Sequence, residues 1–129
     1  MTIKGVRYDV RTGRILGIRE GAVKDIRLEP YAFVEGNGHW DTHYVDVERR
    51  KIVPRPEMQI LQGKAQILAN GEDFVVFRGF PAGTQIRIGG AVHTVNDGVF
   101  EFATTLPGEY LATFELWPYL PMEVTVIAE

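Results

Sequence analysis

The stretch TQIRIGGAVHTVNDGVFEF, residues 84–102, decides the fold of this chain. It contains three short runs in which apolar and polar residues alternate, separated by Gly89-Gly90 and by Asn96-Asp97-Gly98. Alternation with a period of two is typical of a strand with one buried face. Gly-Gly and Asp-Gly are typical of tight hairpin turns because these residues tolerate positive φ angles. The stretch therefore predicts three consecutive antiparallel strands.

The same pattern covers the whole C-terminal part, residues 57–129. Short alternating runs at regular spacing, with Gly-, Pro- and Asn-containing turns between them, favour a compact antiparallel β-sandwich. The expected strands are residues 66–69, 73–78, 84–88, 91–95, 99–102, 110–116 and 122–127. The predicted core consists of Phe74, Val76, Ile86, Ile88, Val95, Phe100, Phe102, Tyr110, Phe114, Val124 and Val126.

Residues 1–56 predict a separate and smaller module. Alternation over residues 6–10, a Gly13-containing turn and an apolar run at 15–18 indicate a β-hairpin. Residues 22–29 fit either a short helical turn or a strand. Pro30 ends that segment, and further strands are expected at residues 31–35, 42–47 and 52–53. A module of about 55 residues has a thin core, so we expect it to depend on a partner.

The boundary between the modules is predicted at Val53-Pro54-Arg55-Pro56. Two prolines fix φ and favour extended backbone before them, which makes a stiff connector. The charge also changes here. Residues 1–58 carry 11 Lys/Arg and 9 Asp/Glu, a net charge of +2, whereas residues 59–129 carry 3 and 8, a net charge of −5. We therefore expect a docking module, residues 1–56, and a sandwich, residues 57–129.

The composition excludes several classes of function. The 129 residues include no cysteine and no serine, which excludes disulfides, thiolate metal sites and Ser-His-Asp catalysis. A net charge of −3 and a pI near 5.6 argue against general nucleic-acid binding. No stretch approaches the roughly 20 apolar residues of a membrane helix, and no signal segment is visible at the N-terminus. We expect a protein made and soluble in the cytoplasm, without membrane partner or cofactor.

The sequence His39-Trp40-Asp41-Thr42-His43 gathers the only cluster of metal-ligating side chains. On an extended strand, residues 39, 41 and 43 point to one face, where two imidazoles and a carboxylate suit zinc or iron. The alternative is a solvated polar strand beside a loop, and it is favoured because nothing in the sequence supplies supporting groups. No metal site is therefore assigned.

Two other groups of residues are candidates for an interface. Arg49, Arg50 and Lys51, together with Arg55, form a basic cluster that suits either a solvated turn or the rim of a protein interface. Trp117-Pro118-Tyr119-Leu120-Pro121 is too rich in proline for a central strand. Its Trp117 and Tyr119 either fold back over the sandwich or are exposed for binding, since Trp and Tyr are enriched at interaction hot spots.

The C-terminal part resembles small Ig-like or PEGA-like β-modules. The resemblance rests on Pro81-Ala-Gly-Thr84, on Asn96-Asp-Gly98, on Pro107-Gly-Glu-Tyr110 and on the Trp-Pro-Tyr-Leu segment at residues 117–120. The implied fold class is all-β and mainly antiparallel, with a small hairpin-rich N-terminal module followed by a compact Ig-like β-sandwich.

The N-terminal part is similar to proteins of tailed bacteriophages. It carries the hairpin pattern Asp-x-x-Thr-Gly-x-Ile at residues 9–15 and Val-Glu-Gly at 34–36. Thr-His-Tyr-Val-Asp follows at residues 42–46, and Val-Pro-Arg-Pro at 53–56. The resemblance implies a virion-associated structural protein of the tail, fibre or capsid-decorating type, and it implies no catalytic residues.

These observations lead to three hypotheses. The first is a non-enzymatic virion protein that docks through residues 1–56 onto other virion proteins, forms homo-oligomers there and projects its sandwich. The second is a module that binds carbohydrate or a host surface through exposed Trp117 and Tyr119. The third, and weakest, is a small metal-dependent enzyme at His39, Asp41 and His43.

Overall fold

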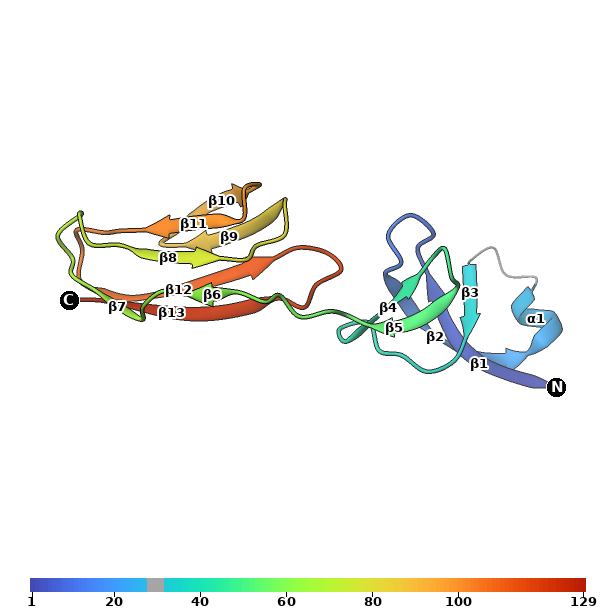
Figure 1. The fold of residues 1–129 in the computed structure, drawn as a ribbon. Helices are drawn as coiled ribbons and strands as arrows, with labels where there is room; N and C mark the ends of the chain where they lie inside the picture. The colour runs from blue at the N-terminus through green and yellow to red at the C-terminus, as the bar shows by residue number, and fades with distance from the viewer. Residues whose placement is uncertain (28–31) are drawn as a thin grey trace. The chain divides into compact units, whose positions relative to one another are not determined.

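The chain divides into two compact units in a computed structural model, which describes residues 1–27 and 32–129 (Figure 1). The N-terminal unit is Met1–Arg55 and the C-terminal unit is Pro56–Glu129, so the division lies one residue before the expected boundary. With these bounds the N-terminal unit carries 11 Lys/Arg and 8 Asp/Glu, a net charge of +3. The C-terminal unit carries 3 and 9, a net charge of −6.

The described part of the N-terminal unit consists of a three-stranded antiparallel sheet, a two-stranded ribbon and one short helix. The sheet has the strand order β2-β1-β3, and β4 pairs with β5. The elements are β1 (Thr2–Tyr8), β2 (Ile15–Ala22), α1 (Val23–Arg27), β3 (Ala32–Glu35), β4 (His43–Asp46) and β5 (Lys51–Pro54). Of the two alternatives for residues 22–29, the helical turn is formed over Val23–Arg27. Residues 28–31, including Pro30, lie outside the described residues.

The core of the N-terminal unit is small. Val6, Tyr8 and Ile15 from the sheet are buried together with Val45 from the ribbon. Gly13 joins the two layers, because its C=O accepts a hydrogen bond of 2.8 Å from the N–H of Val45. Gly13 has a φ of 77°, and a Cβ there would lie 2.1 Å from the Val45 carbonyl oxygen. Glycine is therefore required at this turn on both conformational and steric grounds.

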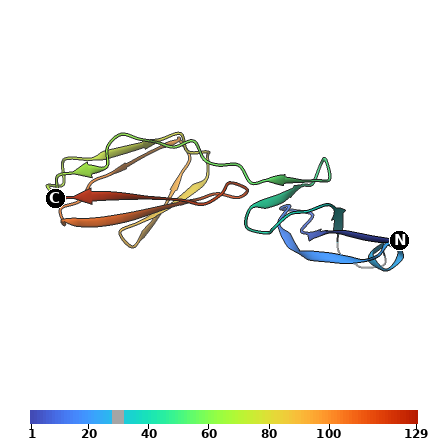
Figure 2. The ribbon, with the colours of Figure 1, turned by 90° about the horizontal axis from the view of Figure 1, so that it is seen from below.

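The C-terminal unit is built from two sheets (Figure 2). One has five strands in the order β10-β9-β12-β13-β7, and the other has three in the order β11-β8-β6. All neighbouring strands are antiparallel except β7 and β13, which are parallel. The strands are β6 (Leu61–Gln62), β7 (Gln66–Ile67), β8 (Val75–Arg78), β9 (Thr84–Ile88), β10 (Ala91–Val95), β11 (Val99–Phe102), β12 (Gly108–Glu115) and β13 (Met122–Ala128).

A single hydrophobic core lies between these two sheets. Phe77 of β8 and Phe114 of β12 are fully buried, and their rings meet edge to face with centroids 5.5 Å apart. Because the two rings come from different sheets, the unit is a β-sandwich. The buried cluster comprises Met58, Ile67, Val75, Phe77, Phe80, Ile86, Ile88, Val95, Ala112, Phe114, Val126 and Ala128.

The prediction for the buried face of β8 is wrong by one residue. Val75 and Phe77 are fully buried, whereas Phe74 is 45% exposed and Val76 is half-buried. All four residues are apolar, so their alternation carried no information about the face. The strand starts at Val75, after a hydrogen-bonded turn at residues 70–73, and the packing of Phe77 against Phe114 identifies its buried face.

Two short strands also differ from the prediction. β6 was not expected, and β7 is shorter than residues 66–69 and runs parallel to its neighbour. Strands of two residues contain too little alternation to be recognised. The other predicted core positions face the core. Ile86, Ile88, Val95, Phe114 and Val126 are buried, and Phe100, Phe102, Tyr110 and Val124 are half-buried against them.

Candidate functional site

The loop of residues 36–42 carries the most exposed aromatic side chain that the structure describes. Trp40 is 64% exposed at the tip of a tight turn. The turn is closed by hydrogen bonds to the C=O of His39 from the N–H groups of Thr42, at 3.2 Å, and His43, at 2.9 Å. The His39 and Trp40 rings lie with their centroids 5.6 Å apart and their planes tilted by 33°. The sequence pattern of this segment indicated metal-ligating side chains and did not indicate an exposed aromatic ring.

Polar contacts brace the same loop. Nδ1 of His39 donates a hydrogen bond to Oδ1 of Asp41, and Nη1 of Arg55 donates one of 3.2 Å to the Asp41 carbonyl. Burial lowers the pKa of Arg55, and the nearby charge of Arg14 lowers it further, whereas Asp41 raises it. The loop between β3 and β4 is thus tied to the end of β5.

The three candidate metal ligands do not converge. His39 and Asp41 contact one another, whereas Nδ1 of His43 is hydrogen-bonded to the hydroxyl of Thr42 at 2.7 Å. Within residues 1–27 and 32–129, no group of three or more His, Cys, Asp or Glu side chains is placed to hold a metal ion. The turn explains the difference, because residues 39–42 are not in the extended conformation that would put alternate side chains on one face.

The predicted basic cluster is divided between the two ends of the β4–β5 ribbon. Arg49 and Arg50 lie in its turn, where Arg49 is 3.8 Å from the Asp46 carboxylate and 80% exposed. Arg50 has a φ of 54° and is exposed. Arg55 lies at the opposite end, after the four-residue strand β5, and contacts Asp41. A strand of this length separates the ends by roughly 13 Å.

The aromatic residues of the β12–β13 connection are half-buried. Tyr119 packs against the sandwich core, and its N–H donates a hydrogen bond of 2.7 Å to the C=O of Leu116. Trp117 is also half-buried. Both are less exposed than Trp40, whereas the carbohydrate hypothesis needs an exposed ring.

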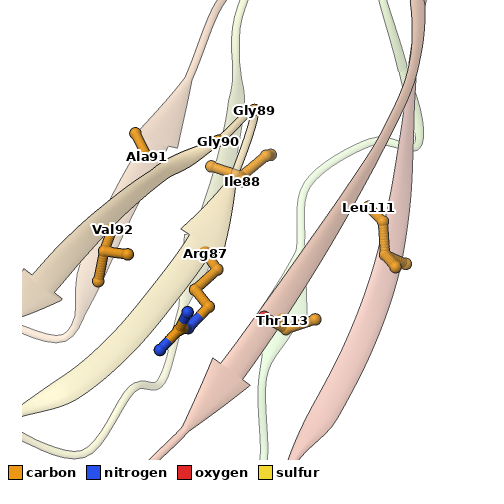
Figure 3. A pocket seen from close by; sticks show the side chains of 8 residues that line it. All are labelled: Arg87, Ile88, Gly89, Gly90, Ala91, Val92, Leu111 and Thr113. Carbon is orange, nitrogen blue, oxygen red and sulfur yellow. The ribbon is translucent and has the colours of Figure 1, made fainter.

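The outer face of the five-stranded sheet has a shallow hollow of about 220 Å³ (Figure 3). Arg87 of β9 lies opposite Val92 on one neighbouring strand and Thr113 on the other, and Leu111 borders the same hollow. The Gly89-Gly90 turn closes one end. An exposed guanidinium with apolar neighbours suits a weak contact with a carboxylate.

A second groove, of about 380 Å³, lies along the side of the sandwich between the edge strands β10 and β11. Its lining includes the aromatic side chains of Phe100, Phe102 and Tyr110. The ring centroids of His93 and Phe100 lie 5.1 Å apart in this groove. The groove combines two unpaired strand edges with apolar side chains, which are the requirements for adding an extended peptide.

Comparison with protein-family models, with curated proteins and with solved structures finds no match to this chain. Among the residues that the structure describes, no helix has the length and apolar character needed to cross a membrane.

Proposed function

We propose that this protein is a non-enzymatic structural component of a tailed phage virion. Its N-terminal unit docks onto a larger assembly of virion proteins, and its C-terminal unit projects as a tail- or fibre-associated or capsid-decorating β-sandwich. The observation that carries the proposal is the division of the chain into two units with separate cores and net charges of +3 and −6. One chain with two unlike surfaces suits a protein that joins one partner and presents a module to another.

The N-terminal unit has the properties of a docking element. Leu16 and Ile18, on the edge strand β2, are 57% and 56% exposed, and Val10 is 60% exposed. The hydrophobic cluster in the described part of the unit contains four buried side chains, with four half-buried ones packed against them. A small core beside exposed apolar side chains supports a role in which a partner covers part of the unit.

The connectivity of the sandwich supports its resemblance to Ig-like modules. The hydroxyl of Tyr110, near the start of β12, donates a hydrogen bond of 2.7 Å to the C=O of Leu106, four residues upstream. Immunoglobulin-like sandwiches use such a tyrosine at the corner that leads into the corresponding strand. The division into β11-β8-β6 and β10-β9-β12-β13-β7 also matches a sandwich whose first strand contributes to both sheets.

Particle fractionation tests the proposal. Phage particles from a host culture that carries this gene are purified on a density gradient and probed for the chain by mass spectrometry. The full chain should sediment with the particles at a fixed ratio to the other virion proteins. A chain reduced to residues 56–129 should fold and remain in the soluble fraction. Full-length protein that stays soluble while particles form normally would refute the proposal.

A further inference from the structure

Trp40 presents an exposed, flat, apolar ring whose neighbours in the sequence are polar or small. The flanking segments Gly36-Asn37-Gly38 and Asp41-Thr42 are polar or lack a side chain. A protein hot spot built on tryptophan lies in a patch of contacts that excludes water. A single ring bordered by hydrogen-bonding groups instead matches a pyranose, which has a face of C–H groups and a rim of hydroxyls.

The hydrogen-bonding groups lie beside the ring in the sequence and in space. The side chains of His39 and Asp41 are 56% and 51% exposed, so a ligand on the ring has access to both. The bond between His39 and Asp41 uses Nδ1 and Oδ1, so Nε2 of His39 and Oδ2 of Asp41 take no part in it. A carboxylate oxygen is a strong acceptor for sugar hydroxyls because charged acceptors form the stronger hydrogen bonds.

The loop is held in one conformation before any ligand binds. Two backbone hydrogen bonds close the turn, the His39–Asp41 contact fixes both side chains, and Arg55 holds the Asp41 carbonyl. Ordering of a binding loop normally opposes association, so a braced loop loses less entropy on binding.

We propose that Trp40 is the stacking platform of a saccharide-binding site in which Asp41 and His39 bind the hydroxyls of the same sugar. Arg55 acts as a positioning residue through the Asp41 carbonyl. The site lies within the N-terminal unit and does not depend on the assignment to a virion. It also relocates the predicted carbohydrate contact, since Trp117 and Tyr119 are half-buried.

The test is a fluorescence titration of the full chain. The chain contains two tryptophans, so a Trp117→Phe background makes Trp40 the only reporter. The probes are chito-, cello- and malto-oligosaccharides and bacterial lipopolysaccharide O-chains, each taken to about 10 mM sugar. At least one should shift the Trp40 emission saturably, with a Kd no weaker than about 1 mM, the affinity of a single modest site.

Variants separate the platform from the fold. In the wild-type background, calorimetry should show that Trp40→Ala weakens binding at least tenfold, about 1.4 kcal/mol. Trp40→Phe should retain part of the affinity, and Asp41→Asn should lower it several-fold. Trp117→Phe is the matched control and should bind as the parent does. Equal thermal midpoints show that each variant is folded, as expected at an exposed position.

Two results would overturn the proposal. One is the absence of saturable binding to every saccharide tested. If Trp40→Ala then also prevents attachment to particles, Trp40 is a protein contact. The other is saccharide binding that survives Trp40→Ala, which would place the site elsewhere. Neither result bears on the particle fractionation of the full chain, so the two proposals fail independently.

Discussion

Removal of one hydroxyl group, by Tyr110→Phe, tests how the sandwich is held together. The hydroxyl donates to the Leu106 C=O at 2.7 Å and accepts from the Thr104 hydroxyl at 3.0 Å. Each hydrogen bond contributes about 0.5–1.5 kcal/mol. Leu106 lies in an exposed loop, so water replaces part of the loss at its carbonyl. We therefore expect Tyr110→Phe to lower the free energy of unfolding by about 1–2 kcal/mol.

The assay must follow the C-terminal unit alone. In a Trp40→Phe background, Trp117 is the only tryptophan and reports on that unit. Urea unfolding followed by Trp117 emission should show a lower midpoint with an unchanged slope, because the exposed surface does not change. In a thermal scan the midpoint should fall by roughly 4–8 °C for each kcal/mol in a unit of this size.

Substitutions at neighbouring residues test whether the loss of stability comes from these hydrogen bonds. Thr104→Val should also destabilise, since its hydroxyl additionally accepts from the Leu106 N–H at 3.1 Å. The double variant Thr104→Val/Tyr110→Phe should lose less than the sum of the two single variants because they share one bond. Thr105→Val, at an exposed adjacent position, should be nearly neutral. A Tyr110→Phe variant as stable as its parent would refute the argument that this corner fastens β12.

Three further predictions concern stability. Phe77→Ala should lower the free energy of unfolding by about 3–5 kcal/mol and leave the C-terminal unit largely unfolded, whereas Phe74→Ala should lower it by less than about 1 kcal/mol. Urea unfolding measures both losses, and similar values would contradict the assigned buried face. The pKa of Asp73 is lowered mainly by its hydrogen bond from Lys64. The stability that this carboxylate provides is therefore present above its unfolded pKa of about 3.9 and is lost as the pH falls through the lower folded pKa. Asp73→Asn should therefore flatten the acid side of the stability profile below the unfolded pKa in thermal scans, and an unchanged acid limb would disprove it. Gly13→Ala should destabilise the N-terminal unit by at least about 2 kcal/mol. Unfolding is monitored by Trp40 emission in the Trp117→Phe background, and an unchanged stability would show that the turn relaxes.

Much of the strand pattern follows from the sequence because it depends on local properties. The run at residues 84–102 formed β9, β10 and β11, with turns at Gly89-Gly90 and Asn96-Asp97-Gly98. Only β9 and β10 pair as a hairpin, because β11 lies in the other sheet and pairs with β8. The Gly residues at 89, 90 and 98 all have positive φ angles, as such turns require. Alternation and turn chemistry are written in neighbouring residues, so neither needed the tertiary structure.

The buried face of β8 and the short strands β6 and β7 did not follow from local sequence. Phe74 and Phe77 are equally apolar, and only the packing of Phe77 against Phe114 distinguishes the buried ring from the exposed one. β6 and β7 exist because β8 and β13 each offer an unpaired edge to a short extended segment. Pairing of this kind joins residues distant in sequence, which no local pattern reports.

The candidate site also followed only in part from the sequence. The pattern His39-Trp40-Asp41-Thr42-His43 indicated the segment, but an extended strand was expected there, which would have aligned both histidines with Asp41. The hydrogen bonds of Thr42 and His43 to the His39 carbonyl turn that segment instead. Trp40 is 64% exposed at this turn, and the His43 side chain is hydrogen-bonded to Thr42, so His39, Asp41 and His43 do not converge.

By itself the sequence determined an all-β chain, the turns at its glycines and the excess of acidic residues in its C-terminal half, because composition, period and turn chemistry are local or additive properties. Only the tertiary structure decided which aromatic rings are exposed. Trp40, Trp117 and Tyr119 are similarly large and amphipathic, and their exposure depends on whether a distant segment covers them. The sandwich core covers part of Tyr119, and Trp40 remains open to solvent.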